Sequence, residues 1–422
     1  MPEHRLLLRD HLGKDLTQLP EYLKLGGFSV WPKALQMGQK GVHEEVKKAN
    51  LRGRGGAGFP AGVKWGFLAD DGRPRYLVVN ADEGEPGTFK DRYFLEKDPF
   101  RQLEGILLTC WTLNIHTCYI YIRGEFWHGR DVTDRAIDQL YKSNWLGKNI
   151  QGSGFDLEVY THPGAGAYIC GEETALIESL EGKPGMPRLK PPFPANIGVF
   201  GMPTLVNNTE TLACVPVIIE IGADAFNALG VAKNGGTKLV GVSGHVKKPG
   251  MYEVRMGTSM REVIYGLAGG VLDDREILAV IPGGSSCPFL TADEIDVAMD
   301  FDSLKTVGSM FGTAGIVVMH DGTDLLTVLR RVAKFYQHES CGQCTPCRQG
   351  TGWLLQLAKK MDEGLAEDAH IDLLVDACNN IEGNTICAHG EAAAWPIRSI
   401  VKKFRPHLER AIRERAALAL GA

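Results

Sequence analysis

Residues Leu51 to Trp65 read LRGRGGAGFPAGVKW, and this stretch decides how the rest of the chain is interpreted. Its glycines crowd into six residues: Gly53, Gly55, Gly56 and Gly58. A backbone without Cβ atoms can adopt positive φ values, and its N–H groups can approach a ligand closely. Arg52, Arg54 and Lys64 add the positive charge that favours a phosphate. The stretch therefore predicts a loop that binds a flat, anionic ligand.

The same stretch contains the pattern G-x-G-x-x-G, which is the fingerprint of a dinucleotide-binding βαβ unit. That fingerprint requires a strand directly before it and a helix that opens on it. Here residues 42–51 have helical composition instead, and Pro60 follows the last glycine closely. We therefore reject the dinucleotide fingerprint. For the stretch taken alone, the alternative is a flexible surface loop.

The overall composition is that of a globular protein of two to three domains. The chain has 422 residues, of which 44% are hydrophobic and 23% charged, and its formal net charge is −5. This balance gives no sign of a nucleic-acid or anionic-membrane partner. The longest apolar run, residues 106–122, contains Asn114 and His116 and is shorter than the roughly 20 residues that span a bilayer. No signal or transit peptide is visible, so we expect a bacterial cytoplasmic protein with no direct membrane insertion.

Strand and helix patterns alternate through the first half of the chain. Strands are predicted near residues 75–80, 116–123 and 156–160, with helices at 99–113 and 130–141 between them. This alternation predicts an α/β domain with a largely parallel sheet over residues 1–232, after a helical lead-in. Beyond it, a hairpin, an amphipathic helix in residues 259–270 and a further strand predict a β-grasp-like domain at 233–322. Residues 323–422 read as a helical bundle.

The most specific chemical signal is the run ESCGQCTPCRQG at residues 339–350. Cys341, Cys344 and Cys347 have the spacing C-x2-C-x2-C, which can hold one corner of a cubane iron-sulfur cluster while a fourth cysteine closes the site. Cys387 is the best candidate for that fourth ligand. Cys378 is the competitor, although the helical text around it favours a packed thiol.

Zinc is an alternative metal for the same cysteines, and the region also predicts the start of a helix. Structural zinc is the alternative, but zinc sites usually combine two C-x2-C pairs. Ten cysteines in a chain without an export signal do not indicate a disulfide framework. Thr345 and Pro346 are predicted as the N-cap and first residue of a helix whose positive end faces the anionic cluster.

Two acidic segments follow predicted strands. In residues 80–92, NADEGEPGTFKDR, Asn80 and Asp82 can hydrogen-bond a heteroaromatic ring or ribityl hydroxyls, and Glu83 and Glu85 can accept from ribose hydroxyls. Ligands bind at this edge of an α/β sheet. Carboxylates there would repel a 2′-phosphate, so NADH is preferred over NADPH. The alternative is a solvated acidic loop.

The second acidic segment is residues 164–180, GAGAYICGEETALIESL, where a glycine-rich turn opens a helix. Glu172 and Glu173 lie in its first turn, and acids there are often only partners of the helix dipole. Three aromatic residues could stack on an adenine or nicotinamide ring, although each alone is more typical of a core: Phe59, Phe67 and Phe193.

At this point the chain resembles the flavoprotein, NADH-binding subunit of respiratory complex I, which is the F subunit of NADH-quinone oxidoreductase. Seven motifs carry the resemblance over almost the whole chain: LRGRGGAGFPAGVKW, NADEGEPGTFKDR, GAGAYICGEETAL, RLKPPFPA, PTLVNNTETL, IPGGSS and ESCGQCTPCRQG with a later cysteine. One departure is Ala388, where many relatives have proline.

The resemblance implies two cofactors, with NADH as the substrate. It implies an FMN phosphate near Lys64, Asn207 and Asn208, with NADH stacked over the flavin. The flavin and NADH residues that it suggests are Gly53, Arg54, Gly55, Gly56, Phe59, Lys64, Phe67, Asn80, Asp82, Glu83, Glu85, Tyr168, Gly171, Glu172, Glu173, Phe193, Val206, Asn207 and Asn208. The 4Fe-4S cluster would be held by Cys341, Cys344, Cys347 and Cys387.

The resemblance also implies a function and partners. The protein would accept hydride from NADH on FMN and release electrons singly to the cluster, with no obligatory catalytic side chain. A thioredoxin-like 2Fe-2S subunit and a large multi-cluster subunit would be its partners, in a complex peripheral to the cytoplasmic membrane. The rivals are a diaphorase subunit of a soluble NAD-linked hydrogenase or formate dehydrogenase, and a non-catalytic zinc scaffold.

Overall fold

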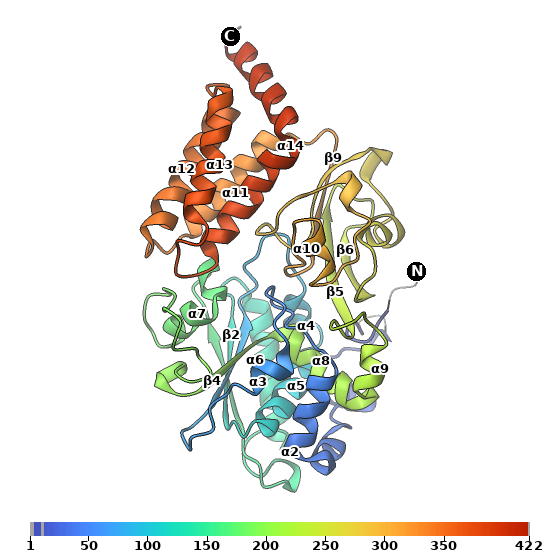
Figure 1. The fold of residues 1–422 in the computed structure, drawn as a ribbon. Helices are drawn as coiled ribbons and strands as arrows, with labels where there is room; N and C mark the ends of the chain where they lie inside the picture. The colour runs from blue at the N-terminus through green and yellow to red at the C-terminus, as the bar shows by residue number, and fades with distance from the viewer. Residues whose placement is uncertain (1–3, 10–11, 421–422) are drawn as a thin grey trace.

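The computed structural model describes residues 4–9 and 12–420. Three units pack together, and Figure 1 shows the helical bundle at the top, the middle unit at the right and the N-terminal unit below. This arrangement confirms the predicted fold: an α/β unit, a β-grasp unit and a helical bundle. The exact domain boundaries, 232/233 and 322/323, stay predictions.

A parallel sheet with strand order β3-β2-β1-β4 forms the centre of the N-terminal unit. Its strands are β1 (Tyr76–Ala81), β2 (Thr117–Ile122), β3 (Glu158–Pro163) and β4 (Thr204–Asn208). Successive side chains point to opposite faces. Leu77 and Val79 therefore join the core under the long helices, whereas Val78 packs with α7 (Glu173–Leu180) on the other face. The Rossmann-like α/β prediction is confirmed.

The helices of the N-terminal unit cover this sheet on both faces. The larger core contains residues of α2 (Trp31–Lys48), α5 (Pro99–Thr112) and α8 (Thr209–Ile221), and α7 covers the opposite face. The remaining helices are α1 (Leu19–Lys24), α3 (Ala61–Trp65), α4 (Asp91–Glu96), α6 (Trp127–Lys142) and α9 (Ala223–Asn227). Because α2, and not a strand, precedes the glycine-rich loop, the rejection of the dinucleotide fingerprint is confirmed.

Helices α5 and α8 cross at one glycine. An added Cβ at Gly105 of α5 would lie 2.0 Å from the carbonyl oxygen of Leu212 in α8. No side chain fits at that separation, so the close approach of the two helices depends on this glycine.

The middle unit is a mixed sheet with strand order β6-β5-β9-β7-β8. Its strands are β5 (Thr237–Gly244), β6 (Gly250–Arg255), β7 (Ile277–Ile281), β8 (Leu290–Thr291) and β9 (Gly315–His320), and the short helix α10 (Ser303–Thr306) precedes β9. β5 pairs antiparallel with β6 and parallel with β9. A hairpin whose first strand lies beside the last strand is the β-grasp order, as predicted.

One element of the middle unit differs from its prediction. The segment expected as a regular amphipathic helix contains a wide helical turn over Glu262–Leu267 instead. Its N–H groups reach further back than in an α-helix, as in the bond from Ala268 N to Val263 O of 2.9 Å. Gly269 and Gly270, both with positive φ, end the turn and permit this geometry.

The C-terminal bundle consists of α11 (Leu325–Glu339), α12 (Thr345–Asp362), α13 (Asp368–Ile381) and α14 (His389–Leu420). The prediction that Thr345 is the N-cap of its helix is wrong by one residue. Cys344 is the N-cap, because its carbonyl already accepts a bond from Arg348 N at 2.7 Å, and Thr345 is the first helical residue.

Residues near the N-terminus tie the first two units together. The carboxylate of Glu253 in β6 accepts from Leu7 N at 2.7 Å and from Leu8 N at 3.0 Å. Arg9 forms a buried ion pair with Asp98 at 2.7 Å, just before α5. The segment thus bonds to both units.

Candidate functional site

The site lies where the strand order of the parallel sheet reverses. From β1 the chain runs outward through β2 and β3 and then returns to place β4 on the other side of β1. Ligands bind in the crevice at the carboxyl ends of the strands next to such a reversal. Asn80 and Asn208 pair there as neighbours across β1 and β4. An added Cβ at Gly55 would lie 3.1 Å from the Asn208 Cβ, so the glycine-rich loop closes directly over this crevice.

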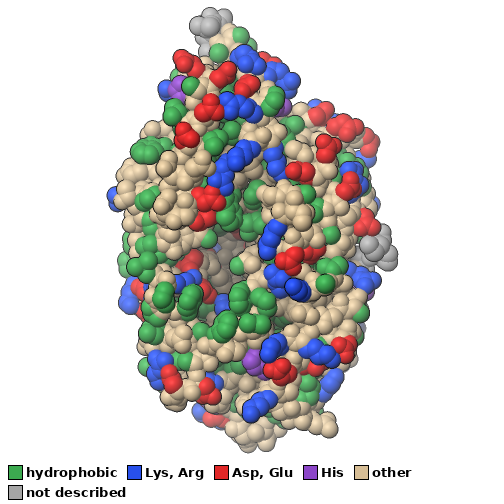
Figure 2. All heavy atoms as spheres, in the orientation of Figure 1, with side chains coloured by type: hydrophobic (Ala, Val, Ile, Leu, Met, Phe, Trp, Pro, Cys, Tyr) green, Lys and Arg blue, Asp and Glu red, His purple; other side chains and the backbone are tan. Residues whose placement is uncertain are grey.

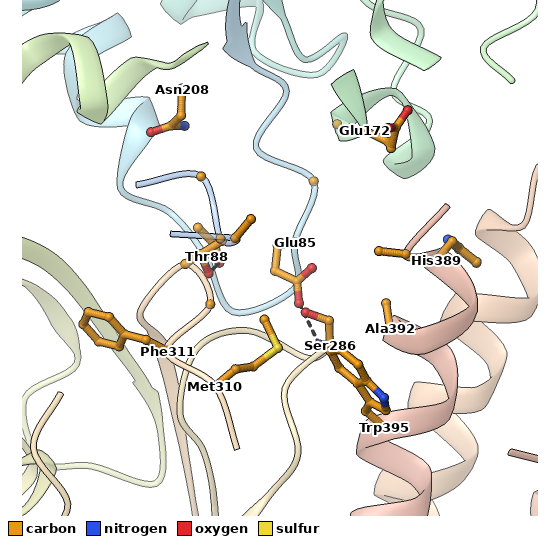
Figure 3. Close-up of a pocket in the computed structure, with 18 of the residues that line it drawn as sticks. Glu85, Thr88, Glu172, Asn208, Ser286, Met310, Phe311, His389, Ala392 and Trp395 are labelled. Atoms are coloured by element: carbon orange, nitrogen blue, oxygen red, sulfur yellow. Dashed lines mark hydrogen bonds between the residues drawn. The ribbon is translucent and has the colours of Figure 1, made fainter. Parts of the chain in front are cut away.

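A cavity of about 770 Å³ occupies this crevice and extends between the three units. Figure 2 shows the surface hollowed there, below the bundle, with apolar side chains around the opening. Several predicted site residues line it: Gly55, Gly56, Asn80, Asp82, Glu83, Glu85, Tyr168, Gly171, Glu172 and Asn208. In Figure 3, Ser286, Met310 and Phe311 enter from the middle unit, and His389, Ala392 and Trp395 from α14.

Asp82 presents an unsatisfied acceptor in the wall of this cavity. Its side chain is buried, and its Oδ2 has no hydrogen-bond partner. Burial raises its pKa to about 7. Nearby, Asn80 donates through Nδ2 to the Gly171 carbonyl at 2.8 Å, which fixes its orientation. A buried carboxylate oxygen without a donor fits a ligand that carries hydroxyl or N–H groups, such as the ribityl chain of the expected flavin.

Glu83 and Glu85 are already engaged within the protein. Glu83 accepts from the N–H groups of Asp91 at 2.7 Å and Arg92 at 3.2 Å, so it caps the start of α4, and burial raises its pKa to about 7. Glu85 accepts from the Tyr168 hydroxyl at 2.7 Å. It also accepts from Ser286 N at 2.7 Å, and Figure 3 shows these two residues side by side. Glu85 thus joins the loop after β1 to both η3 (Tyr168–Gly171) and the middle unit.

Glu172 and Glu173 lie at the start of α7, as the sequence indicated. Glu172 is the N-cap and accepts from Thr174 N at 2.8 Å and Ala175 N at 2.9 Å. Glu173 pairs with Lys64 at 2.9 Å and with Lys190 at 3.0 Å. Burial opposes its ionisation, but the two ammonium groups prevail and lower its pKa.

The remaining predicted flavin and NADH residues do not line the cavity. They are Gly53, Arg54, Phe59, Lys64, Phe67, Glu173, Phe193, Val206 and Asn207. The rings of Phe59 and Phe67 lie 6.1 Å apart and are exposed, as is Phe193, so these three offer an aromatic surface. The buried side chain of Asn207 accepts from the Trp65 indole at 3.0 Å. The roles of all nine residues stay predictions.

Arg54 occupies an unexpected place for a phosphate ligand. Its side chain is fully buried, and its guanidinium donates to the Gly235 and Thr237 carbonyls, both at 2.9 Å. It therefore contacts the start of the middle unit.

Lys90 is the clearest site residue that sequence reasoning missed. It lines the cavity, is 1% exposed, and donates to Asp91 at 2.7 Å and Asn208 at 3.3 Å. A lysine within the acidic run NADEGEPGTFKDR was the available signal. Residues such as Trp395 and Met310 gave no signal, because they reach the cavity only through the packing of distant units.

The four predicted cluster cysteines gather at one end of the bundle. Cys341 and Cys344 lie in the loop before α12, Cys347 in its first turn, and Cys387 in the loop before α14. Ile386 N lies 3.3 Å from the Cys344 Sγ, so the two loops are in contact. Cys341 and Cys387 both pack against the core that contains α7.

The competitor Cys378 lies elsewhere. It is fully buried in the bundle core on α13, and burial raises its thiol pKa to about 12. Apolar side chains of the bundle enclose it, whereas Cys387 lies on the loop that contacts Cys344, so its position excludes Cys378 as the fourth ligand.

Within residues 4–9 and 12–420, no three His, Cys, Asp or Glu side chains converge as ligands of a single metal ion. Each cysteine of a 4Fe-4S cluster binds a different iron atom, so these ligands need not meet at one point. Three thiols on the loop before α12 and in its first turn, with one more on the loop that contacts it, fit such a cluster. Across the same residues, no helix is long and apolar enough to cross a membrane.

Comparison with known proteins agrees with this geometry. The Nuo51 FMN-binding domain matches residues 46–217, the SLBB domain 238–328, and the iron-sulfur binding region of NADH-ubiquinone oxidoreductase-F 327–411. The F subunit of NADH-quinone oxidoreductase from Rickettsia felis is 51% identical over 95% of this chain and 96% of its own length. The Rickettsia bellii protein of the same name is 50% identical over 96% and 98%.

A solved structure is also similar. A chain of the air-oxidized NAD+-reducing NiFe-hydrogenase aligns with a TM-score of 0.84 and 33% identity, over 97% of this chain and 67% of that one. The relatives at about 50% identity over nearly full length settle the family: this chain belongs to the family of the F subunit of NADH-quinone oxidoreductase.

Proposed function

We propose that this protein is the NADH-oxidising subunit of a respiratory NADH-quinone oxidoreductase. It takes electrons from NADH in the cavity between its units and delivers them to the four-cysteine end of the bundle. FMN, when bound, supplies the chemistry that accepts a hydride and releases single electrons, and the 4Fe-4S cluster receives them.

One observation carries this proposal: residues 168–172 separate the cavity from the cysteines. Tyr168, Ile169, Gly171 and Glu172 line the cavity, while Ile169 and Cys170 belong to the core against which Cys341 and Cys387 pack. Ala388, the residue after Cys387, lines the cavity as well. Only short segments therefore lie between the expected flavin and the expected cluster. Electrons would cross little protein between the two.

The chain's own residues orient and shield the reactants. Asp82 offers an acceptor to ribityl hydroxyls, and the glycine-rich loop brings backbone N–H groups to the cavity. Glu85, Tyr168 and Ser286 close the wall between units through their hydrogen bonds. Phe59, Phe67 and Phe193 would hold the adenine side of NADH, and Lys64 and Asn207 a phosphate, as the family resemblance suggests. No side chain need act as acid or base.

The test is an anaerobic visible spectrum of the purified protein before and after addition of NADH, then NADPH. Flavin and broad iron-sulfur absorption should bleach with NADH and far less with NADPH. A coloured protein that is indifferent to NADH would overturn the substrate. A colourless protein that contains zinc would favour a scaffold.

Asp82→Ala is expected to weaken FMN binding by roughly 10-fold to 100-fold. Above a pH of about 7, where the Asp82 carboxyl is ionised, loss of one hydrogen bond to this charged, buried acceptor costs about 1.5–3 kcal/mol. The dissociation constant can be measured through the quenching of FMN fluorescence on addition of the flavin-free protein. Asp71→Ala, on an exposed loop, is the matched control. Equal affinity of both variants would refute the role of Asp82.

Membership of a multi-subunit complex follows from the relatives' names, and the partners are part of the proposal. We infer a thioredoxin-like 2Fe-2S subunit and a large multi-cluster subunit, in a peripheral arm on the cytoplasmic side of the membrane. Affinity purification of the chain from its own cells, with identification of bound subunits by mass spectrometry, tests both partners.

A second candidate is a diaphorase subunit of a soluble hydrogenase, favoured by the TM-score of 0.84. The same purification separates the two functions. Co-purification of a hydrogenase large subunit would support this candidate, whereas membrane subunits would support the respiratory complex.

A further inference from the structure

A buried network of charges lies beneath the cavity and joins it to the middle unit. Glu210, in the first turn of α8, is at its centre and is fully buried. Its Oε2 pairs with Lys238 in β5 at 2.6 Å and with Lys90 at 3.0 Å, and its Oε1 accepts from Leu239 N at 3.0 Å. Lys238 is also fully buried and does not line the cavity.

Lys90 is the member of this network that reaches the cavity. Its ammonium contacts Asp91 at 2.7 Å, Glu210 at 3.0 Å and Asn208 at 3.3 Å. An ammonium has three donors, so these acceptors saturate it. Lys90 therefore acts on a ligand through its electric field and not through a hydrogen bond.

Glu210 interacts electrostatically with all three cations of the network. The cations are Lys90, Lys238 and Arg54, and Asp91 and Glu83 are the other carboxylates beside Lys90. Burial opposes ionisation of Glu210, but Lys238, Lys90 and Arg54 lower its pKa to about 2, so it stays charged. Buried charges are screened much less than exposed ones.

We propose that Lys238 of the middle unit is a positioning residue that sets the electrostatic potential of the flavin cavity, through Glu210 and Lys90. This inference rests on the proposed function, because it concerns the flavin. FMN bound in the cavity would gain one negative charge on accepting a hydride. Lys238 neutralises part of the Glu210 charge, so that Lys90 can stabilise that negative charge.

Two single variants should shift the flavin midpoint potential in opposite directions. Lys238→Met removes a positive charge and should lower the potential. Glu210→Gln removes a negative charge, keeps the acceptor for Leu239 N, and should raise it. One charge at about 10 Å in an effective dielectric of 20 changes an equilibrium roughly tenfold. At fixed ambient potential, the ratio of oxidised to reduced FMN should thus rise or fall about tenfold. For a two-electron couple this corresponds to a shift of about 30 mV in the midpoint potential.

The double variant Lys238→Met/Glu210→Gln removes one charge of each sign. Its ratio of oxidised to reduced FMN, at the same ambient potential, should return to within about threefold of the wild-type ratio. A merely structural role predicts shifts of the same sign in both single variants and a larger one in the double variant. Lys247→Met is the matched control, because Lys247 lies in the same unit and pairs with the exposed Asp274.

The experiment is a redox titration of the FMN-loaded protein, followed by flavin absorbance after subtraction of the spectrum of the FMN-free protein. If Lys238→Met does not fold, Glu210→Gln alone decides, because a lowered or unchanged potential contradicts the proposal. The FMN dissociation constant is measured for each protein. A wild type that binds no FMN overturns both the proposed function and this inference. A wild type that binds FMN and is reduced by NADH, with no opposite shifts in the variants, overturns the inference alone.

Discussion

Cys387→Ala is expected to abolish the iron-sulfur cluster, whereas Cys378→Ala leaves it in place. Cys387 lies on the loop that contacts Cys344 through Ile386, and Cys378 lies inside the bundle core. The measurement is iron and acid-labile sulfide per chain, with four of each in the wild type as expected for a 4Fe-4S cluster. Cys387→Ala should fall to near zero.

Cys378→Ala is the control for general damage to the bundle. It removes a buried sulfur from the core and should cost about 1 kcal/mol of unfolding free energy, with unchanged iron. Loss of iron in Cys378→Ala but not in Cys387→Ala would reverse the assignment. Zinc in place of iron in the wild type would support the scaffold alternative.

Gly105→Ala is expected to destabilise the N-terminal unit by about 3 kcal/mol or more. The new methyl group would meet the Leu212 carbonyl at 2.0 Å, and a backbone atom inside a helix cannot rotate away. Overpacking of a core costs about 1–3 kcal/mol, and a clash with backbone belongs at the upper end. Urea denaturation of the flavin-free protein measures the loss.

Gly352→Ala is the matched control for that substitution. Gly352 lies in α12, where an added Cβ meets no heavy atom within 4 Å. Alanine is the better helix former, so this variant should gain roughly 0.5–1 kcal/mol. Equal stability of Gly105→Ala and the wild type would show that α5 and α8 can separate without cost.

Displacement of α8 in Gly105→Ala should also weaken FMN binding, because Asn208 caps this helix beside the cavity.

The local fold could be predicted well because its signals are local. The strand at 76–81 is a β-branched run, and α5 begins at Pro99 as predicted. The wide turn at 262–267 could not be predicted. Its pattern of apolar residues is the same whether each N–H bonds four or five residues back. The Thr345 error has a similar cause, since Thr is an ordinary cap and only the backbone shows that Cys344 takes that place.

The site was predictable only where a motif carries its own chemistry. The glycine-rich loop and the acidic loop reach the cavity as expected, through Gly55, Gly56 and Asp82. Arg54 looked like part of the same loop, yet its side chain turns toward the middle unit. Lys238 lies in that unit and meets Glu210 only through tertiary packing. Contacts between units leave no local pattern in a sequence.

The bonds from Leu7 and Leu8 to Glu253 set an order for events during synthesis. Leu7 and its acceptor are 246 residues apart in the chain. At 5–20 residues per second, a ribosome needs roughly 12–50 seconds to make that length. During this interval the N–H groups of Leu7 and Leu8 lack the Glu253 carboxylate that accepts from them in the folded chain. These two bonds thus close only after β6 has been made, however early the α/β unit folds.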